Sequence, residues 1–311
     1  MSAAEQDARR GFWAAFTAFV IWGMLPIYIR QLAPTEAVEI MAHRVLWACL
    51  FVFTYLAIKG ETGKVWAALA DAKARLRLAA TAVLITINWL VYVWAASNGH
   101  VVEASLGYFI NPLVSVLLGV FVLKEKLSRW QWVSVSLAAL GVLWLTLQVG
   151  RPPYIAIALA LSFGLYGLLR KQVAVESVPG LGVEVLLIAP VMLVYLAFKA
   201  HSGTLTFAHY SLYVDAFLIL GGAITAIPLV LFAYGVRRVP LSTIGILQYV
   251  GPTLQLLTGV FVFHEPFSQI QLVGFGLIWA ALAVYMGEGY WRGRRMRLNA
   301  ALSEAGAPTR S

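Results

Sequence analysis

One signature occurs twice in this chain, 140 residues apart, and both copies lie within long apolar stretches. The copies run from 108 to 125 and from 248 to 265, and they share a proline (Pro112 and Pro252) and the tetrapeptide Gly-Val-Phe-Val. Further matched pairs, at a spacing of 140 or 141, are Trp22 and Phe163, Glu125 and Glu265, Ser128 and Ser268, and Gln131 and Gln271. Chance similarity between apolar segments does not readily keep such varied residues in one register. We therefore infer an internal duplication, a pattern typical of secondary transporters.

The composition requires apolar surroundings. Of the 311 residues, 61% are hydrophobic and 12% are charged, whereas soluble domains have about 25% charged residues. We therefore expect the chain to contact membrane lipids. The single cysteine, Cys49, allows no disulfide within the chain and no cysteine-based zinc site. The net charge of +9 lies in short clusters between apolar runs, which favours membrane loops over a nucleic-acid partner.

Ten segments are apolar and long enough to cross a bilayer as helices, which takes about 20 residues. They cover residues 12–31, 37–58, 77–98, 102–123, 130–148, 154–170, 181–198, 213–235, 241–263 and 270–288. We therefore predict an all-α membrane protein with ten transmembrane helices. The duplication divides it into a five-helix repeat over 12–148 and a second over 154–288, with tails at 1–11 and 289–311.

The basic residues set the predicted orientation. With the N-terminus in the cytoplasm, nineteen of the 23 lysines and arginines fall in cytoplasmic segments. Only Arg30, Arg151 and Lys199 fall outside, and Arg44 lies within the second segment. Because lysine and arginine concentrate on the cytoplasmic side, we expect both termini there and the chain in the inner (plasma) membrane. Five segments per repeat is an odd number, so the second repeat is inverted relative to the first.

Charged side chains within a membrane segment cost about 2.5–3.5 kcal/mol at the helix centre, so each one is informative. The second segment holds Glu39, His43 and Arg44. Glu39 and His43 share a helix face. They could bind a polar substrate group or handle protons, since histidine titrates near neutral pH. The alternative is structural, with Glu39 and Arg44 neutralising each other or capping neighbouring helices.

Polar and aromatic side chains also gather on single faces of the third, fourth and ninth segments. They are Asn88, Trp89, Tyr92, Tyr108, Asn111 and Gln248. An amide side chain that faced lipid would have no hydrogen-bond partner, so we expect these amides to point into the protein. We predict that these residues line a cavity for a ring-bearing or amphipathic molecule. Packing of the aromatic rings alone is the alternative.

Pro112 and Pro252 interrupt the fourth and ninth segments at matched positions. A proline within a helix removes one backbone hydrogen bond and frees a carbonyl group. Their matched placement favours a pair of hinges, and a static kink that helps packing is the alternative.

Glu184 echoes Glu39, because Ala37-Val-Glu39 aligns with Gly182-Val-Glu184. Two carboxylates at opposite mouths of one pathway would suit paired gates. A carboxylate also suits the start of a helix, which is the interpretation we favour for Glu184. Small residues in the fifth and tenth segments predict close helix packing or a homodimer interface. No motif for ATP, a metal ion or a catalytic triad is present, so we expect no cofactor.

These features together resemble a known family. The motifs that carry the resemblance are His43-Arg44 with Trp47, Asn88-Trp89, Glu103-Ala-Ser-Leu-Gly-Tyr-Phe-Ile-Asn-Pro112, Gln248-Tyr-Val-Gly-Pro252 and Val262-Phe-His-Glu-Pro266. Over about residues 10–290 the chain resembles the EamA branch of the drug/metabolite transporter superfamily, and more narrowly its RarD-type permeases. The resemblance implies an inner-membrane carrier of ten spans whose cavity is lined by spans one to four and six to nine. It also implies export of small metabolites or drugs.

We therefore expect a secondary transporter that moves a small metabolite or drug-like molecule by alternating access, in the direction of export. An uncoupled facilitator or channel is the first alternative, and it would need a continuous polar stripe. An intramembrane enzyme is the second, and it would need a nucleophile–base pair or a set of metal ligands, neither of which is visible in the sequence.

Overall fold

The computed structural model describes residues 3–97, 101–148, 153–264 and 268–305, and within these ranges it is helical with no β-strand. Nine helical segments of the described chain are long and apolar enough to cross a membrane. A further apolar helix, Leu106–Phe121, is shorter. It lies in the predicted fourth span.

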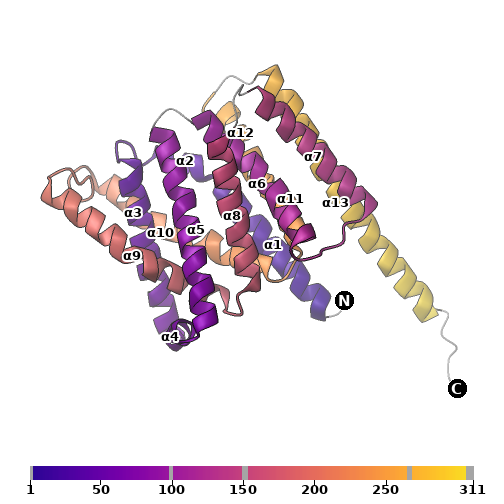
Figure 1. Cartoon of the computed structure of the whole chain (residues 1–311), viewed down its shortest axis with the longest axis horizontal. Helices are drawn as coiled ribbons and strands as arrows, with labels where there is room; N and C mark the ends of the chain where they lie inside the picture. Colours follow the sequence, from indigo (N-terminus) through magenta and orange to yellow (C-terminus); the bar gives the residue numbers. More distant parts are fainter. Residues whose placement is uncertain (1–2, 98–100, 149–152, 265–267, 306–311) are drawn as a thin grey trace. The chain divides into compact units, whose positions relative to one another are not determined.

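The helices follow one another along the chain with short connections (Figure 1). In order they are α1 (Ala3–Gly23), α2 (Leu25–Arg30), α3 (Ala37–Ile58), α4 (Thr62–Ala70), α5 (Ala72–Ser97), α6 (Val101–Phe121), α7 (Arg129–Leu147), α8 (Tyr154–Gln172), α9 (Ser177–His201), α10 (Leu212–Val236), α11 (Leu241–Gln248), α12 (Val250–Leu257), the π-helix η1 (Thr258–Val262) and α13 (Gln269–Ala305). The predicted first span comprises two helices, α1 and α2, and the predicted ninth comprises α11, α12 and η1. Both α1 and α13 extend into segments that we predicted as tails.

The chain folds as two compact units. Unit 1 comprises Met1–Glu125 and Arg151–Phe267, and unit 2 comprises Lys126–Gly150 and Ser268–Ser311. The helices of unit 2 are α7 and α13, the predicted fifth and tenth spans, which lie side by side (Figure 1). All other helices belong to unit 1.

Small residues bring α7 and α13 into close contact within unit 2. A Cβ atom at Gly141 would lie 2.7 Å from the carbonyl oxygen of Gly274. The Ser134 hydroxyl donates to the carbonyl oxygen of Ala281 at 2.7 Å. Helices in a membrane associate through such packing and polar contacts because lipid is as apolar as their side chains.

The two copies of the duplicated signature end with the same local structure. Lys124 and His264, at matched positions, both adopt the left-handed backbone conformation, with φ of 56°. Four residues later, Ser128 and Ser268 each begin a helix with a reciprocal cap. Each serine hydroxyl accepts from the N–H of the glutamine three residues on, whose side-chain oxygen accepts from the serine N–H. The matched Glu265 lies outside the described residues.

Glycines let the helices of unit 1 meet at their backbones. A Cβ atom at Gly222 of α10 would lie 2.5 Å from the backbone of Trp47 on α3. A Cβ atom at Gly245 of α11 would lie 2.6 Å from the carbonyl oxygen of Pro112 on α6. As a result α6 and α11, which carry matched parts of the duplicated sequence, cross in direct contact.

The helix break between α1 and α2 leaves a carbonyl group that another helix binds. The break lies at Met24, shortly before Pro26. Pro26 has no N–H to donate to the Trp22 carbonyl one turn earlier. That oxygen instead accepts from Nε2 of Gln255 on α12 at 3.2 Å.

The matched prolines of the two halves have different effects on their helices. Pro252 cannot donate to the Gln248 carbonyl, and the helix is interrupted at Tyr249, between α11 and α12. Pro112 lies within α6, which is continuous. The equivalence of the two prolines in sequence therefore does not extend to the backbone around them.

Candidate substrate site

A cavity of about 160 Å³ lies inside unit 1. Its lining comes from α1, α2, α3, α5, α6, α8, α10, α11 and α12, so both halves of the sequence contribute. Aromatic and apolar residues predominate, with a few polar side chains among them, as in sites for small organic ligands. The family resemblance implied a contribution from the seventh span, but none of the described lining residues lies on α9.

Arg44 is the only charged residue among the described residues of the lining. It lies on α3, and its Nε donates to Oγ1 of Thr225 on α10 at 2.8 Å. The Thr225 hydroxyl donates its own hydrogen to the Gly221 carbonyl at 2.7 Å, which leaves its lone pairs for the guanidinium. Gly221 also provides space, because a Cβ atom there would lie 2.9 Å from Cγ of Arg44.

Two amide side chains of the lining are held by neighbouring helices. Nδ2 of Asn88 on α5 donates to the Leu159 carbonyl at 2.9 Å and to the Ser162 hydroxyl at 3.0 Å, both on α8. Oε1 of Gln248 on α11 accepts from the Ser115 hydroxyl of α6 at 3.2 Å. Since these bonds fix the side chains, the polar groups around the cavity are positioned before any ligand binds.

Asn111 adds a polar group to the lining. Its Oδ1 is buried and has no hydrogen-bond partner among the described residues. Buried polar atoms in proteins are nearly always paired. This oxygen is therefore suited to accept a hydrogen bond from a bound molecule.

Aromatic rings form most of the remaining lining. Trp22 of α1 and Phe163 of α8, a matched pair in the duplication, lie edge to face with ring centres 5.8 Å apart. Tyr92 of α5 and Tyr108 of α6 meet in the same manner at 5.7 Å. Such edges and faces can pack against a planar ligand.

The structure brings most of the predicted binding residues together around this cavity. Those that line it are Arg44, Asn88, Trp89, Tyr92, Tyr108, Asn111 and Gln248. Of the two predicted hinge prolines, Pro252 lines the cavity and Pro112 does not. Glu39 and His43 are not among the lining residues either.

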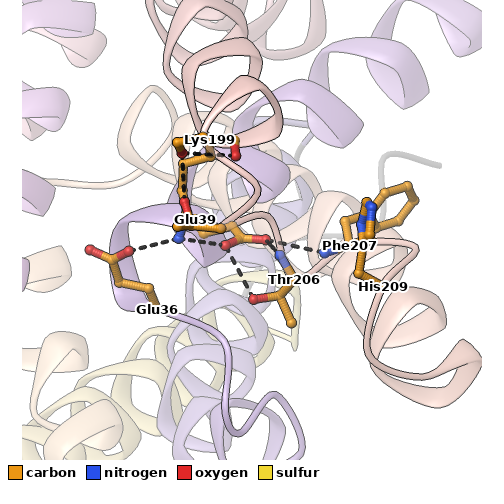
Figure 2. A network of polar contacts seen from close by, with 8 residues as sticks. Glu36, Glu39, Lys199, Thr206, Phe207 and His209 are labelled. Carbon is orange, nitrogen blue, oxygen red and sulfur yellow. Dashed lines mark hydrogen bonds and ion pairs between the residues drawn. The ribbon is translucent and has the colours of Figure 1, made fainter.

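Glu39 lies at the centre of a separate polar cluster (Figure 2). Its side chain is fully buried, and Oε1 accepts from the backbone N–H groups of Thr206 at 2.7 Å and Phe207 at 3.2 Å. Oε2 lies 3.0 Å from Nζ of Lys199, which also binds Glu36 at 2.8 Å. Glu39 thereby ties α3 to α9 and to the loop before α10.

The partner of Glu39 is therefore Lys199 and not Arg44, so the structural alternative in which Glu39 and Arg44 neutralise each other is wrong. Five residues separate the two on α3, which turns their side chains about 140° apart around the helix. His43 lies on the Glu39 side, with its ring 4.8 Å from that of Phe207, centre to centre. The Nε2 atom of His43 is buried and has no hydrogen-bond partner among the described residues.

Glu184 is also fully bound by other side chains. Its Oε1 accepts from the Thr81 hydroxyl at 2.6 Å and lies 3.6 Å from Nη1 of Arg170. The Tyr166 hydroxyl donates to Oε2 at 3.4 Å. Since α9 begins at Ser177, Glu184 lies well inside the helix, and the expectation that it starts a helix is wrong.

The resemblance implied that the first, sixth and eighth spans line the cavity, but the sequence did not identify which of their residues do so. These residues are Phe19, Trp22, Leu25, Pro26, Ile29, Phe163, Thr225 and Leu229. The repeat register that pairs Trp22 with Phe163 was a usable signal. Thr225 was another, because a hydroxyl in an apolar segment needs a hydrogen-bond partner. The apolar residues carry no signal that separates them from ordinary packing.

Comparison with known proteins places these features in context. The model of the EamA-like transporter family matches residues 9–147 and 153–287. The uncharacterized transporter YojE of Bacillus subtilis is 44% identical over 285 residues, which cover 90% of this chain and 94% of that protein. Protein RarD of Streptomyces exfoliatus is 41% identical over 306 residues, 98% of this chain and 96% of its own. A solved crystal structure with 18% identity shares the fold, with a TM-score of 0.68 over 88% of this chain and 96% of that one.

Proposed function

Because the chain belongs to the EamA-like transporter family, we propose that it is a secondary transporter that exports a small metabolite or drug-like molecule by alternating access. Its family and its many apolar helices make it a multi-pass membrane protein and not an enzyme. The observation that carries the proposal is the cavity in unit 1, because helices from both halves line it and polar groups lie among its aromatic rings. Such sites between duplicated halves are where secondary transporters bind substrate.

We propose that the membrane-spanning part has ten helices in two inverted repeats of five, over 12–148 and 154–288. The short apolar helix Leu106–Phe121 would be the tenth span beside the nine longer ones. The repeated helix caps at Ser128 and Ser268 support the duplication. An odd number of spans per repeat makes inversion follow from duplication.

We propose further that the chain lies in the inner (plasma) membrane with both termini in the cytoplasm. Support comes from the nineteen basic residues that this orientation places inside. Its partners would then be a small-molecule substrate and the surrounding lipids.

A substitution that fills the cavity tests the transport proposal. Gly251 lines the cavity, and a Cβ atom there would meet only the Phe19 carbonyl oxygen, at 3.7 Å. Asn111 occupies the matched position before Pro112, so a side chain fits before a proline in this context. We expect Gly251→Phe to abolish the difference in released metabolites between cells with and without the protein, measured by mass spectrometry of the medium.

Gly276→Phe is the matched control. No described atom lies within 4 Å of a Cβ at Gly276 on α13, and that residue does not line the cavity. This variant should release metabolites as the parent protein does. Equal release by both variants, at equal protein level, would contradict the cavity as the route. Counterflow in liposomes separates a carrier from a facilitator or channel, because only a carrier is accelerated by substrate on the far side.

A further inference from the structure

The guanidinium of Arg44 is only partly used by the protein. Its one hydrogen bond to a described residue is from Nε to Thr225. The two Nη groups carry the other four N–H donors of the side chain. Arg44 also lies over the ring of Trp89, with Cζ 5.8 Å from the ring centroid. The head group is therefore held through Nε, and its two-pronged Nη edge has no hydrogen-bond partner among the described residues.

No described residue supplies a negative charge for Arg44. The described lining of the cavity contains no aspartate or glutamate, and Arg44 forms no ion pair with a described residue. Glu39 on the same helix is occupied by Lys199 and by the backbone of Thr206 and Phe207. An unpaired cation inside a membrane protein is unfavourable, and such residues commonly mark the path of a substrate or ion.

The free edge of Arg44 matches one kind of ligand group. Two parallel N–H donors fit the two oxygens of a carboxylate, and such bonds are stronger than neutral ones. One positive charge in the lining balances a single negative charge, which favours a carboxylate over a phosphate monoester with about two charges. Rings such as Trp89, Tyr92 and Tyr108 can pack against a planar body attached to that carboxylate.

We propose that this cavity selects small aromatic carboxylates, with Arg44 binding the carboxylate and Thr225 holding the guanidinium in position. The proposal rests on the proposed transport function and names the substrate class of the same site. It makes Arg44 the residue that distinguishes an acid from its uncharged analogue, and it gives Thr225 a positioning role.

Acids and their amides test the proposal because each pair differs in charge but little in shape. We would measure binding by calorimetry to the purified full chain in lipid nanodiscs, using benzoate and benzamide, phenylacetate and phenylacetamide, and indole-3-acetate and indole-3-acetamide. At least one acid should bind about tenfold or more tightly than its amide, since a hydrogen-bonded charge pair is lost with the amide. Arg44→Gln should remove this preference.

Further variants keep the test decisive if Arg44→Gln fails to fold. Arg44→Lys keeps the charge but loses the two-pronged donor, and Thr225→Val removes the acceptor for Nε at similar volume. Both should reduce the preference for the acid. Arg30→Gln is the control, because Arg30 lies over the Phe263 ring and does not line the cavity, so the preference should persist.

The proposal is wrong if no acid binds more tightly than its amide, or if Arg44→Gln, Arg44→Lys and Thr225→Val all leave the preference unchanged. This failure differs from failure of the transport proposal. Loss of release in Gly251→Phe without any preference for acids would retain the transporter and reject this substrate class. Unchanged release in Gly251→Phe would reject the route itself.

Discussion

Two carboxylates bind Lys199, and they differ chiefly in burial. Glu36 and Glu39 lie 2.8 Å and 3.0 Å from its Nζ, but the Glu36 side chain is 60% exposed and that of Glu39 is fully buried. An exposed pair contributes about 0–1 kcal/mol. Removing one partner of a buried pair costs about 3–5 kcal/mol, because the remaining charge is left without compensation. Glu39 is therefore the carboxylate on which the junction of α3 and α9 depends.

A pair of glutamine substitutions checks this difference. Glu39→Gln should reduce the free energy of unfolding by about 3 kcal/mol, the lower end of this range, because Lys199 loses its buried partner but keeps the exposed Glu36. Glu36→Gln, the matched control at the same lysine, should cost about 1 kcal/mol or less. Thermal unfolding of the purified proteins in detergent would compare them. Equal losses of stability in the two variants would contradict the importance of burial.

Proton coupling through Glu39 and His43 stays a prediction, and the same variant tests it. Coupling requires that Glu39→Gln, which keeps the shape and removes the charge, change the pH dependence of transport. The position of Glu39 outside the cavity lining favours a structural role instead. A structural role predicts an unchanged pH profile at equal amounts of folded protein.

The sequence could predict which polar side chains point inward, because their hydrogen-bonding groups would find no partner in lipid. Asn88 and Gln248 are such residues, and each finds its partner on another helix. It could not predict the partner of Glu39. Lys199 lies 160 positions later in the sequence, near the end of α9, where a lysine could equally well be exposed to water. Which charges meet depends on helix packing, and no local pattern encodes that.

Glu125 connects the end of α6 to the start of α11. Its carboxylate accepts from the N–H groups of Leu241 and Ser242 at 2.6 Å and 2.9 Å, and from the Ser242 hydroxyl at 2.7 Å. A negative charge suits the unpaired N–H groups at a helix N-terminus. Gly119 leaves the necessary space, because a Cβ atom there would lie 2.7 Å from Oε2 of Glu125. The Glu125 side chain thus anchors the start of α11, the helix that places Gln248 in the cavity lining.

Removing this charge should loosen the first turns of α11. We expect Glu125→Gln to speed amide hydrogen exchange in a peptide spanning 241–248 about tenfold, because charge-assisted hydrogen bonds to two backbone amides are weakened. Exchange measured by mass spectrometry would check this. Glu176→Gln is the control, since Glu176 is an exposed carboxylate paired with Lys64. Unchanged exchange at 241–248 in Glu125→Gln would contradict the anchoring role.

Hydropathy located the nine described segments that are helical and long enough to cross a membrane, but it could not locate the breaks within them. Pro112 and Pro252 stand at matched positions in similar sequence, yet only the helix containing Pro252 is interrupted. A proline removes a single hydrogen bond, and the surrounding helices decide whether the backbone stays continuous. The break at Met24 has the same explanation, because the freed Trp22 carbonyl is bound by Gln255 from another helix.

The proposed orientation of the whole chain rests on its basic residues, and two turns allow a direct test. Gly60 and Gly203 both have positive φ, and no described atom lies within 4 Å of a Cβ at either position. Open turns of this kind tolerate insertions. A reporter enzyme that is active only outside the cytoplasm should be inactive when inserted at Gly60 or fused after residue 311. It should be active at Gly203. The reverse pattern would contradict the proposed topology.

The paired-hinge hypothesis concerns the whole molecule, because alternating access moves one repeat against the other around a central site. Alanine at position 112 or 252 restores a backbone N–H and stiffens α6 or the α11–α12 junction. If the halves are inverted, the two substitutions should bias the cavity toward opposite faces of the membrane. A single cysteine can report this bias. Leu229→Cys in a Cys49→Ala background places a thiol in the cavity lining.

Labelling of that thiol by an impermeant reagent would be compared in right-side-out and inside-out vesicles. Paired hinges predict that Pro112→Ala and Pro252→Ala shift the ratio of outside to inside labelling in opposite directions. A shift with Pro252→Ala alone would reject the pairing, since α6 is already continuous through Pro112. A ratio unchanged in both variants, with transport intact, would make both prolines static kinks. Opposite shifts would mean that α6 and the α11–α12 junction move the cavity in opposite senses although their local structures differ. That is the behaviour expected of two inverted repeats.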